Sequence, residues 1–192
     1  MTILRFHADD VPPSGPADAL FHVIPVPYEK TVSYGAGTSN GPRAILEASA
    51  QLEVFDGRSR PADYGIHTTD AVDCSSPHED NLNRIRNAVA QTLALSRIPV
   101  LLGGEHTLTT GAIDACIDRF GSDFGVVQFD AHADLRETYE GSLYSHACVM
   151  KRIVDRGLPV YQIANRSYCE AEAVLRRENR IPHCDEIGRA HV

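Results

Sequence analysis

The sequence lacks several features that would place it in a large class of proteins. No apolar run approaches the length of a membrane span, and the first twenty residues contain no long apolar segment of the secretory type. The five cysteines are odd in number and form no CxxC pair, so we expect reduced thiols in the cytoplasm. Excess positive charge is also missing. The formal net charge is −8, which argues against a nucleic-acid partner and mildly suits a cationic small molecule.

The sequence has enough apolar residues to build a core. Of the 192 residues, 43% are hydrophobic, which predicts one globular domain. Apolar runs that read as strands alternate with segments of helical spacing. We expect strands at residues 21–26, 65–68, 98–102, 124–129 and 158–164, and helices at 42–55, 79–96, from 107 onward and at 170–178. This alternation predicts an α/β fold of three α/β/α layers with a mainly parallel sheet. The run 98–102 reads as a strand buried on both faces.

Polar clusters follow two consecutive predicted strands. Gly-Gly-Glu-His occupies residues 103–106, and Asp-Ala-His-Ala-Asp occupies residues 130–134. Ligands bind beyond the carboxyl ends of the strands in open parallel sheets. If the second segment stays extended, the side chains of Asp130, His132 and Asp134 share one face.

These donors suit a metal ion, although a plainer interpretation exists. Carboxylate and imidazole donors without thiolate favour Mn²⁺, Mg²⁺, Fe²⁺ or Zn²⁺. Carboxylates can also bridge two ions that generate a hydroxide nucleophile. Taken alone, the Asp-x-His-x-Asp spacing fits a solvated loop equally well, and Gly-Gly could be a simple turn. Their place after consecutive strands favours the metal site.

Together, the motifs identify a family resemblance. The sequence resembles the ureohydrolases, the manganese-dependent family of arginases and agmatinases. The blocks that carry the resemblance are VIPVPYEKTVSYGAGTSNGPRAILEAS (23–49), LGGEHT (102–107) and FDAHADLRETYEGSLYSHA (129–147), with the less specific IANRSY (163–168). The match runs over nearly the whole chain to about Ile181.

The resemblance implies a binuclear Mn²⁺ site. His106 and Asp134 would bind one ion, Asp130 would bridge, and His132 would bind the other. A manganese-bound bridging hydroxide would then attack the guanidinium carbon. His146 lies where the family keeps a catalytic histidine that shuttles a proton or orients the substrate.

Other positions receive supporting roles by the same resemblance. Glu105 is expected to orient a ligand, and Ser33 and Gly37 are expected to shape the N-terminal loop. The resemblance also implies a cytoplasmic homo-oligomer when complete, with a guanidino small molecule as substrate and no membrane partner.

The loop after the metal block bears on the substrate. Arginases usually carry Ser-Gly-Asn-x-His-Gly there, whereas this chain has Glu-Gly-Ser-Leu-Tyr-Ser-His-Ala at 140–147. This departure favours the agmatinase branch of polyamine biosynthesis, which converts agmatine to putrescine and urea. A guanidino-acid ureohydrolase such as guanidinobutyrase is one alternative. A zinc amidohydrolase of the related deacetylase fold is another, which the paired motifs disfavour.

A departure from the family concerns the end of the sequence. The family completes its metal site with an Asp-x-Asp pair, and no such pair follows residue 134 here. We therefore interpret residues 1–185 as an incomplete ureohydrolase domain that is inactive alone. The final seven residues, EIGRAHV, back-translate to a common sequencing adapter, so we interpret 186–192 as a non-native tail, with an ordinary polar tail as the alternative. A non-catalytic relative or fragment that acts only in assembly is the remaining alternative.

Overall fold

The computed structural model describes residues 4–8 and 10–185, which fall into two compact units divided between Arg119 and Phe120. Each unit contains its own three-stranded sheet. The assignment of residues 1–185 to one domain stays a prediction, and the proposed tail at 186–192 lies outside the described residues.

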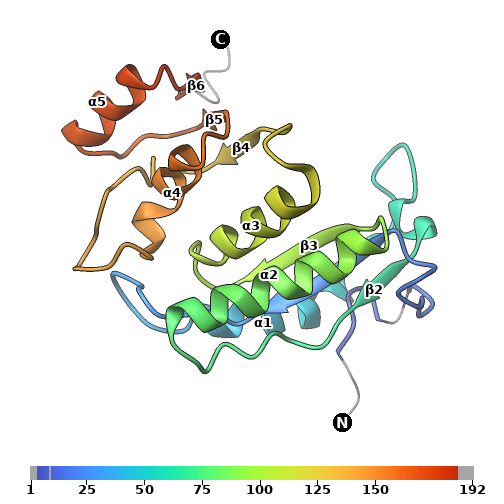
Figure 1. The fold of residues 1–192 in the computed structure, drawn as a ribbon. Coiled ribbons are helices and arrows are strands. Elements are labelled where there is room, and N and C mark those ends of the chain that lie inside the picture. The colour runs from blue at the N-terminus through green and yellow to red at the C-terminus, as the bar shows by residue number, and fades with distance from the viewer. Residues whose placement is uncertain (1–3, 9, 186–192) are drawn as a thin grey trace, which may run out of the picture. The chain divides into compact units, whose positions relative to one another are not determined.

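The first unit is built around a parallel sheet of order β2–β1–β3 (Figure 1). Its strands are β1 (Phe21–Val26), β2 (Ile66–Thr68) and β3 (Ile98–Gly103), and its helices are α1 (Gly41–Ser49), α2 (His78–Ala94) and α3 (Leu108–Phe120), with 3₁₀ turns η1 (Thr38–Asn40) and η2 (Pro61–Tyr64). The helices α1 and α2 both pack against β1 and β3.

Local sequence explains these elements. The central strand β1 is buried from its second residue to its last and is apolar except for the buried His22. Pro42 lies in the first turn of α1, where its missing N–H leaves no hydrogen bond unmade. In α2 the buried apolar side chains recur at helical spacing, as the sequence predicts, and they are Leu82, Ile85, Val89 and Leu93.

Two expectations for the first unit need correction. Helix α1 ends at Ser49 instead of near residue 55, and the side chains from Gln51 to Phe55 are mostly exposed, so no burial stabilises a longer helix. The strand β3 is not buried on both faces, since Ile98 and Val100 are exposed. It is an outer strand of its three-stranded sheet, and its apolar sequence alone did not reveal this.

The second unit also contains a parallel sheet, of order β4–β5–β6. The strands are β4 (Val126–Phe129), β5 (Val160–Ile163) and β6 (His183–Cys184), and the helices are α4 (Val149–Asp155) and α5 (Glu170–Glu178), with the 3₁₀ turn η3 (His146–Cys148) before α4. The sequence reading missed α4 and β6. Because β6 pairs with β5, the strand expected to be the last one is instead central.

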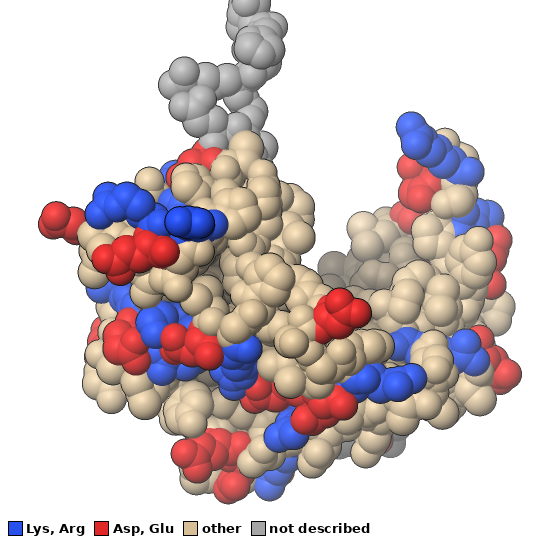
Figure 2. Space-filling view, turned by 45° about the horizontal axis from the view of Figure 1, so that its top comes forward, with Lys and Arg blue, Asp and Glu red and all other residues tan. Residues whose placement is uncertain are grey.

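Some global expectations can be compared with the described residues. All strand pairs between the named strands are parallel. None of the five cysteines, which all lie in the described ranges, forms a disulfide. Within those ranges no helix is long and apolar enough to cross a membrane. On the face shown in Figure 2, acidic and basic side chains lie among one another.

Candidate metal centre

The segment from Asp130 to Asp134 begins where β4 ends. The Asp130 N–H donates to the carbonyl of Ile163 at 3.1 Å, which continues the pairing of β4 with β5 by one residue. The chain then turns. The His132 N–H donates to Asp130 Oδ1 at 2.8 Å, and Nδ1 of the same imidazole lies 3.5 Å from that oxygen. Asp134 adopts a left-handed conformation with φ of 51°. The segment is therefore not extended throughout, so the condition under which Asp130, His132 and Asp134 would share one face is not met.

Buried amide side chains hold this turn in place. Asn165 Nδ2 donates to the carbonyls of Asp130 (2.7 Å) and His132 (2.8 Å). Gln162 Nε2 donates to the carbonyl of Ala133 at 2.7 Å and to Gln128 Oε1 at 2.6 Å. All three amide residues are at least 95% buried. They fix the backbone that carries the predicted ligands.

Asp134 occupies the most enclosed position of the predicted ligands in the second unit, with 7% of its surface exposed. Burial raises its pKa to about 7, and the nearby carboxylates of Asp130 and Glu172 act in the same direction. A cation bound among these carboxylates would offset the cost of ionising the buried Asp134 carboxyl group. Oxygen and imidazole donors suit a hard or intermediate divalent ion. The residues present therefore fit a metal ion such as Mn²⁺.

Glu172 connects the end of this turn to α5. Its Oε1 accepts from the Leu135 N–H at 3.0 Å, and its Oε2 accepts from the Cys169 N–H at 2.8 Å. The carboxylate is buried and therefore stiffens the backbone just after Asp134. The carbonyl of Asp134 accepts from the Met150 and Lys151 N–H groups at the start of α4. The turn that carries the candidate metal ligands is thus tied to α4 and α5.

His146 is the predicted catalytic histidine, and it begins η3. The residue is half-buried, and its imidazole forms a T-shaped pair with the Tyr139 ring at a centroid distance of 5.6 Å. Ser145 Oγ lies 3.4 Å from its Nδ1. The ring is therefore oriented by its neighbours while part of its surface stays accessible.

His106 belongs to the first unit and follows β3. Thr109 Oγ1 lies 3.2 Å from its Nδ1, which orients the imidazole at the start of α3. Of the predicted ligands in the second unit, Asp130 and Asp134 have carboxylate oxygens within 4.8 Å of each other. The His132 imidazole lies 3.5 Å from Asp130, but its side chain is 65% exposed and His132 is not part of that group of close donors. His106 is positioned by the first unit alone.

The role expected for Glu105, orienting a ligand, stays a prediction, and its hydrogen bonds are as follows. Its Oε2 accepts from the N–H groups of Lys30 (2.7 Å) and Thr31 (2.6 Å), and its Oε1 accepts from the hydroxyls of Thr31 (2.6 Å) and Thr107 (2.8 Å). The Glu105 N–H donates to the carbonyl of Tyr28 at 2.9 Å. Glu105 therefore joins the segment that carries His106 to the loop after β1.

Comparison with known proteins decides the family. The model of the arginase family matches residues 19–192. The chain belongs to the arginase family. The family explains why a Gly-Gly-Glu-His turn and an Asp-Ala-His-Ala-Asp turn follow successive strands of one chain, and it confirms the predicted fold class of mainly parallel sheets flanked by helices.

Individual relatives make the similarity more specific. The chain is 42% identical to the N(1)-aminopropylagmatine ureohydrolase of Synechocystis sp. over 174 residues, covering 86% of this chain and 57% of that protein. It is 30% identical to the agmatinase of Pyrococcus horikoshii over 173 residues, with coverages of 85% and 58%. The solved agmatine ureohydrolase of Thermoplasma volcanium aligns with a TM-score of 0.83 at 26% identity, covering 96% of this chain and 62% of that one. The chain thus spans about three fifths of the length of these arginase-family relatives.

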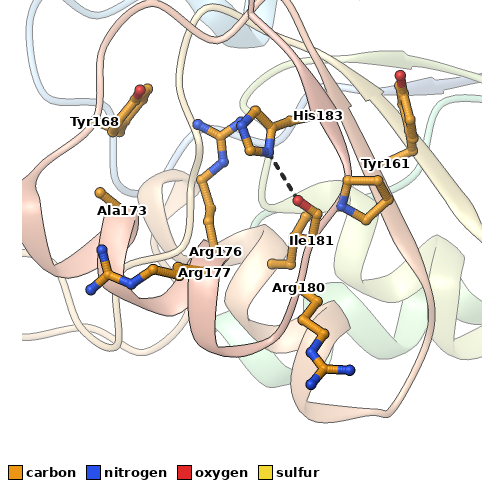
Figure 3. A pocket seen from close by; sticks show the side chains of 9 residues that line it. Tyr161, Tyr168, Ala173, Arg176, Arg177, Arg180, Ile181 and His183 are labelled. Atoms are coloured by element: carbon orange, nitrogen blue, oxygen red, sulfur yellow. Dashed lines mark hydrogen bonds between the residues drawn. The ribbon is translucent and has the colours of Figure 1, made fainter.

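The second unit also contains a pocket of about 590 Å³ between α5 and the β5–β6 edge (Figure 3). Arg176 lines it and is buried by an ion pair with Asp185 (2.8 and 3.1 Å) and by the face of Tyr168. The guanidinium groups of Arg177 and Arg180 point away from that of Arg176 in Figure 3. The lining holds arginines and tyrosines, with His183 as its one histidine and no carboxylate, so it lacks the donor set of a metal-dependent hydrolase of cationic guanidino compounds.

Proposed function

We propose that the complete protein is a ureohydrolase that hydrolyses a linear guanidino compound to urea and a primary amine. The observation that carries this proposal is the turn from Asp130 to Asp134 in a chain of the arginase family. Buried amide side chains fix the backbone of this turn, which bears the candidate metal ligands. In this proposal His106, Asp130, His132 and Asp134 would be the residues of this chain that hold Mn²⁺.

The chain's own residues have distinct tasks in the proposed reaction. The bound metals would supply a hydroxide nucleophile at neutral pH. His146 moves a proton between substrate and solvent, which suits an accessible imidazole. The amides of Gln162 and Asn165 keep the ligand-bearing backbone fixed, so the ligands need little reorganisation.

The proposed substrate is agmatine, which would give putrescine and urea. The loop 140–147 departs from the arginase pattern, and the relatives named agmatinase support this choice. The higher identity to N(1)-aminopropylagmatine ureohydrolases favours the aminopropyl derivative of agmatine as a second candidate. Both molecules share the guanidinobutyl group that the proposed site would bind. We also propose a cytoplasmic homo-oligomer.

The 192 residues alone should release little or no urea. Four candidate ligands are present, and no Asp-x-Asp pair follows Asp134 to complete a two-metal site. A suitable test compares the chain as given with a chimaera in which the C-terminal part of the Synechocystis relative follows Asp185. Urea release is measured with agmatine, N(1)-aminopropylagmatine, arginine and guanidinobutyrate. Faster turnover of arginine than of both agmatine-type substrates would contradict the substrate assignment, and full activity of the 192 residues would contradict the requirement for further ligands.

A further inference from the structure

Strand β4 buries a polar side chain and exposes apolar ones. Gln128 is buried, whereas its neighbours Val127 and Phe129 are 58% and 75% exposed. A buried amide costs free energy unless its polar atoms are hydrogen-bonded, so packing alone would favour an apolar residue at this position. The hydrogen bonds of Gln128 are therefore the feature that explains its place in the strand.

A carbonyl acceptor determines which way two amide groups face. The Ala133 carbonyl can only accept, so the Gln162 atom that lies 2.7 Å from it is the NH₂ nitrogen. The same NH₂ group donates to Gln128 at 2.6 Å, so the Gln128 atom that it meets is the carbonyl oxygen Oε1. The NH₂ group of Gln128 then lies on the other side of its amide.

This NH₂ group is directed at a candidate metal ligand. Gln128 Nε2 donates to Asp134 Oδ2 at 3.3 Å and to the carbonyl of His132 at 3.4 Å. Gln128 and Asp134 are both buried in the second unit. A chain of donors therefore runs from Gln162 through Gln128 and ends on one oxygen of the Asp134 carboxylate.

We propose that Gln128 is a positioning residue for the metal site, whose NH₂ group holds Oδ2 of Asp134 and so directs Oδ1 to the ion. The inference rests on the proposed function and deepens it. Hydrogen-bond partners of a ligand carboxylate fix its orientation. A neutral amide suits this task, because a lysine would neutralise the charge that attracts the ion, and a further carboxylate would add to the repulsion between Asp134 and the nearby Asp130.

The test uses the chimaera and its Gln128→Met variant, which nearly keeps the side-chain volume and removes the donor. Mn²⁺ binding is measured without substrate, by equilibrium dialysis and metal analysis. Losing a hydrogen-bond partner of a metal ligand typically weakens metal binding about 10–100-fold, so the dissociation constant should rise by about that factor.

The matched control is Val160→Ala. Val160 is also buried in the second unit, but it pairs with Val126 at the amino ends of β4 and β5, whereas Asp134 follows the carboxyl end of β4. The substitution should lower the free energy of unfolding and leave the affinity for Mn²⁺ unchanged.

A spectrum of the bound ion separates positioning from a loss of stability. Co²⁺ accepts the same oxygen and imidazole donors, and its visible absorption depends on the number of ligands. Without the NH₂ group of Gln128, Asp134 can bind the ion through both oxygens. The absorption of bound Co²⁺ should therefore change in Gln128→Met and stay the same in Val160→Ala.

The Gln128→Asn variant provides the answer if circular dichroism shows that Gln128→Met does not fold. Because the distance from Nε2 to Asp134 Oδ2 is already 3.3 Å, an amide one methylene shorter cannot reach that oxygen, and Mn²⁺ binding should again weaken. Parent-like affinity or a parent-like Co²⁺ spectrum in a folded Gln128 variant overturns the inference, as does an equal loss of affinity in Val160→Ala, while the parent chimaera still binds Mn²⁺ and releases urea. A parent chimaera that binds no Mn²⁺ overturns the proposed function and this inference with it.

Discussion

Replacing Glu105 by alanine should destabilise the first unit strongly. The buried carboxylate accepts hydrogen bonds from Lys30, Thr31 and Thr107, and its removal leaves these donors without that acceptor. Hydrogen bonds to a charged group contribute about 1.5–3 kcal/mol each, and water can replace some of them here because Lys30 is exposed. We expect the free energy of unfolding to fall by about 3–5 kcal/mol. For a chain of this length the midpoint of thermal unfolding should fall by roughly 6–20 °C.

The Glu105→Gln variant separates loss of hydrogen bonds from loss of charge. The amide oxygen can accept from the Lys30 and Thr31 N–H groups, while the NH₂ group donates to the hydroxyls of Thr31 and Thr107, which can act as acceptors. We expect a loss below about 1.5 kcal/mol. Circular dichroism measures the unfolding midpoint, and hydrogen exchange measures protection of the Lys30 and Thr31 amides. If alanine and glutamine give the same stability and the same protection, the carboxylate does not hold the loop as described.

The remaining predictions concern the second unit and the loop of residues 29–39, whose ends are joined by hydrogen bonds from the Gly37 and Ser39 N–H groups to the Glu29 carboxylate. In the chimaera, His132→Ala should lower the manganese content measured by metal analysis, whereas His146→Ala should keep the metal and lower turnover by roughly 10²–10⁴-fold; metal loss in the latter would make His146 a ligand. The folded-state pKa of Glu29 is depressed to about 2, so the hydrogen bonds that close the loop should be fully formed above about pH 4.5 and break as the pH falls through 2; proteolysis of the loop by pepsin checks this, with Glu29→Gln expected to lose the pH dependence. Gln162→Leu removes donors from the buried Ala133 carbonyl and from Gln128, and should cost about 2–3 kcal/mol in urea denaturation, while an unchanged midpoint would contradict the role of the amide.

Elements with strong local signals could be predicted from the sequence. Strand β1 and helix α5 have the predicted bounds, Phe21–Val26 and Glu170–Glu178. In β1 a continuous apolar run is bounded by turn residues, and in α5 acidic residues in the first turn and arginines in the last favour a helix of that length.

Elements that depend on distant contacts could not be predicted. Helix α4, Val149–Asp155, is short, and its first N–H groups donate to the carbonyl of Asp134. Strand β6 contains two residues and exists through its pairing with β5. The exposure of β3 likewise follows from strand order, which an apolar run does not encode.

The candidate site also has a part that the sequence predicts and a part that depends on distant contacts. Residue types and spacing indicated Asp130, His132 and Asp134, since metal donors at a strand end are a local signal. The bend between them depends on Gln162 and Asn165, about thirty residues later in the chain. A weak signal for these amides does exist, because Gln128 and Gln162 are polar residues at buried positions of otherwise apolar strands.

The amides that hold the candidate metal-binding turn determine how the turn responds to pH. Gln128, Gln162 and Asn165 keep the same charge across the whole pH range, so the backbone that they support does not change shape when protons are gained or lost. Carboxylates or histidines at these positions would couple the geometry of the turn to the proton concentration. The amides are not the only supports, because the carboxylate of Glu172 also accepts a hydrogen bond from the backbone just after Asp134. If the proposed metal site forms, acid should therefore release the metal while the hydrogen bonds from Gln162 and Asn165 to the turn remain.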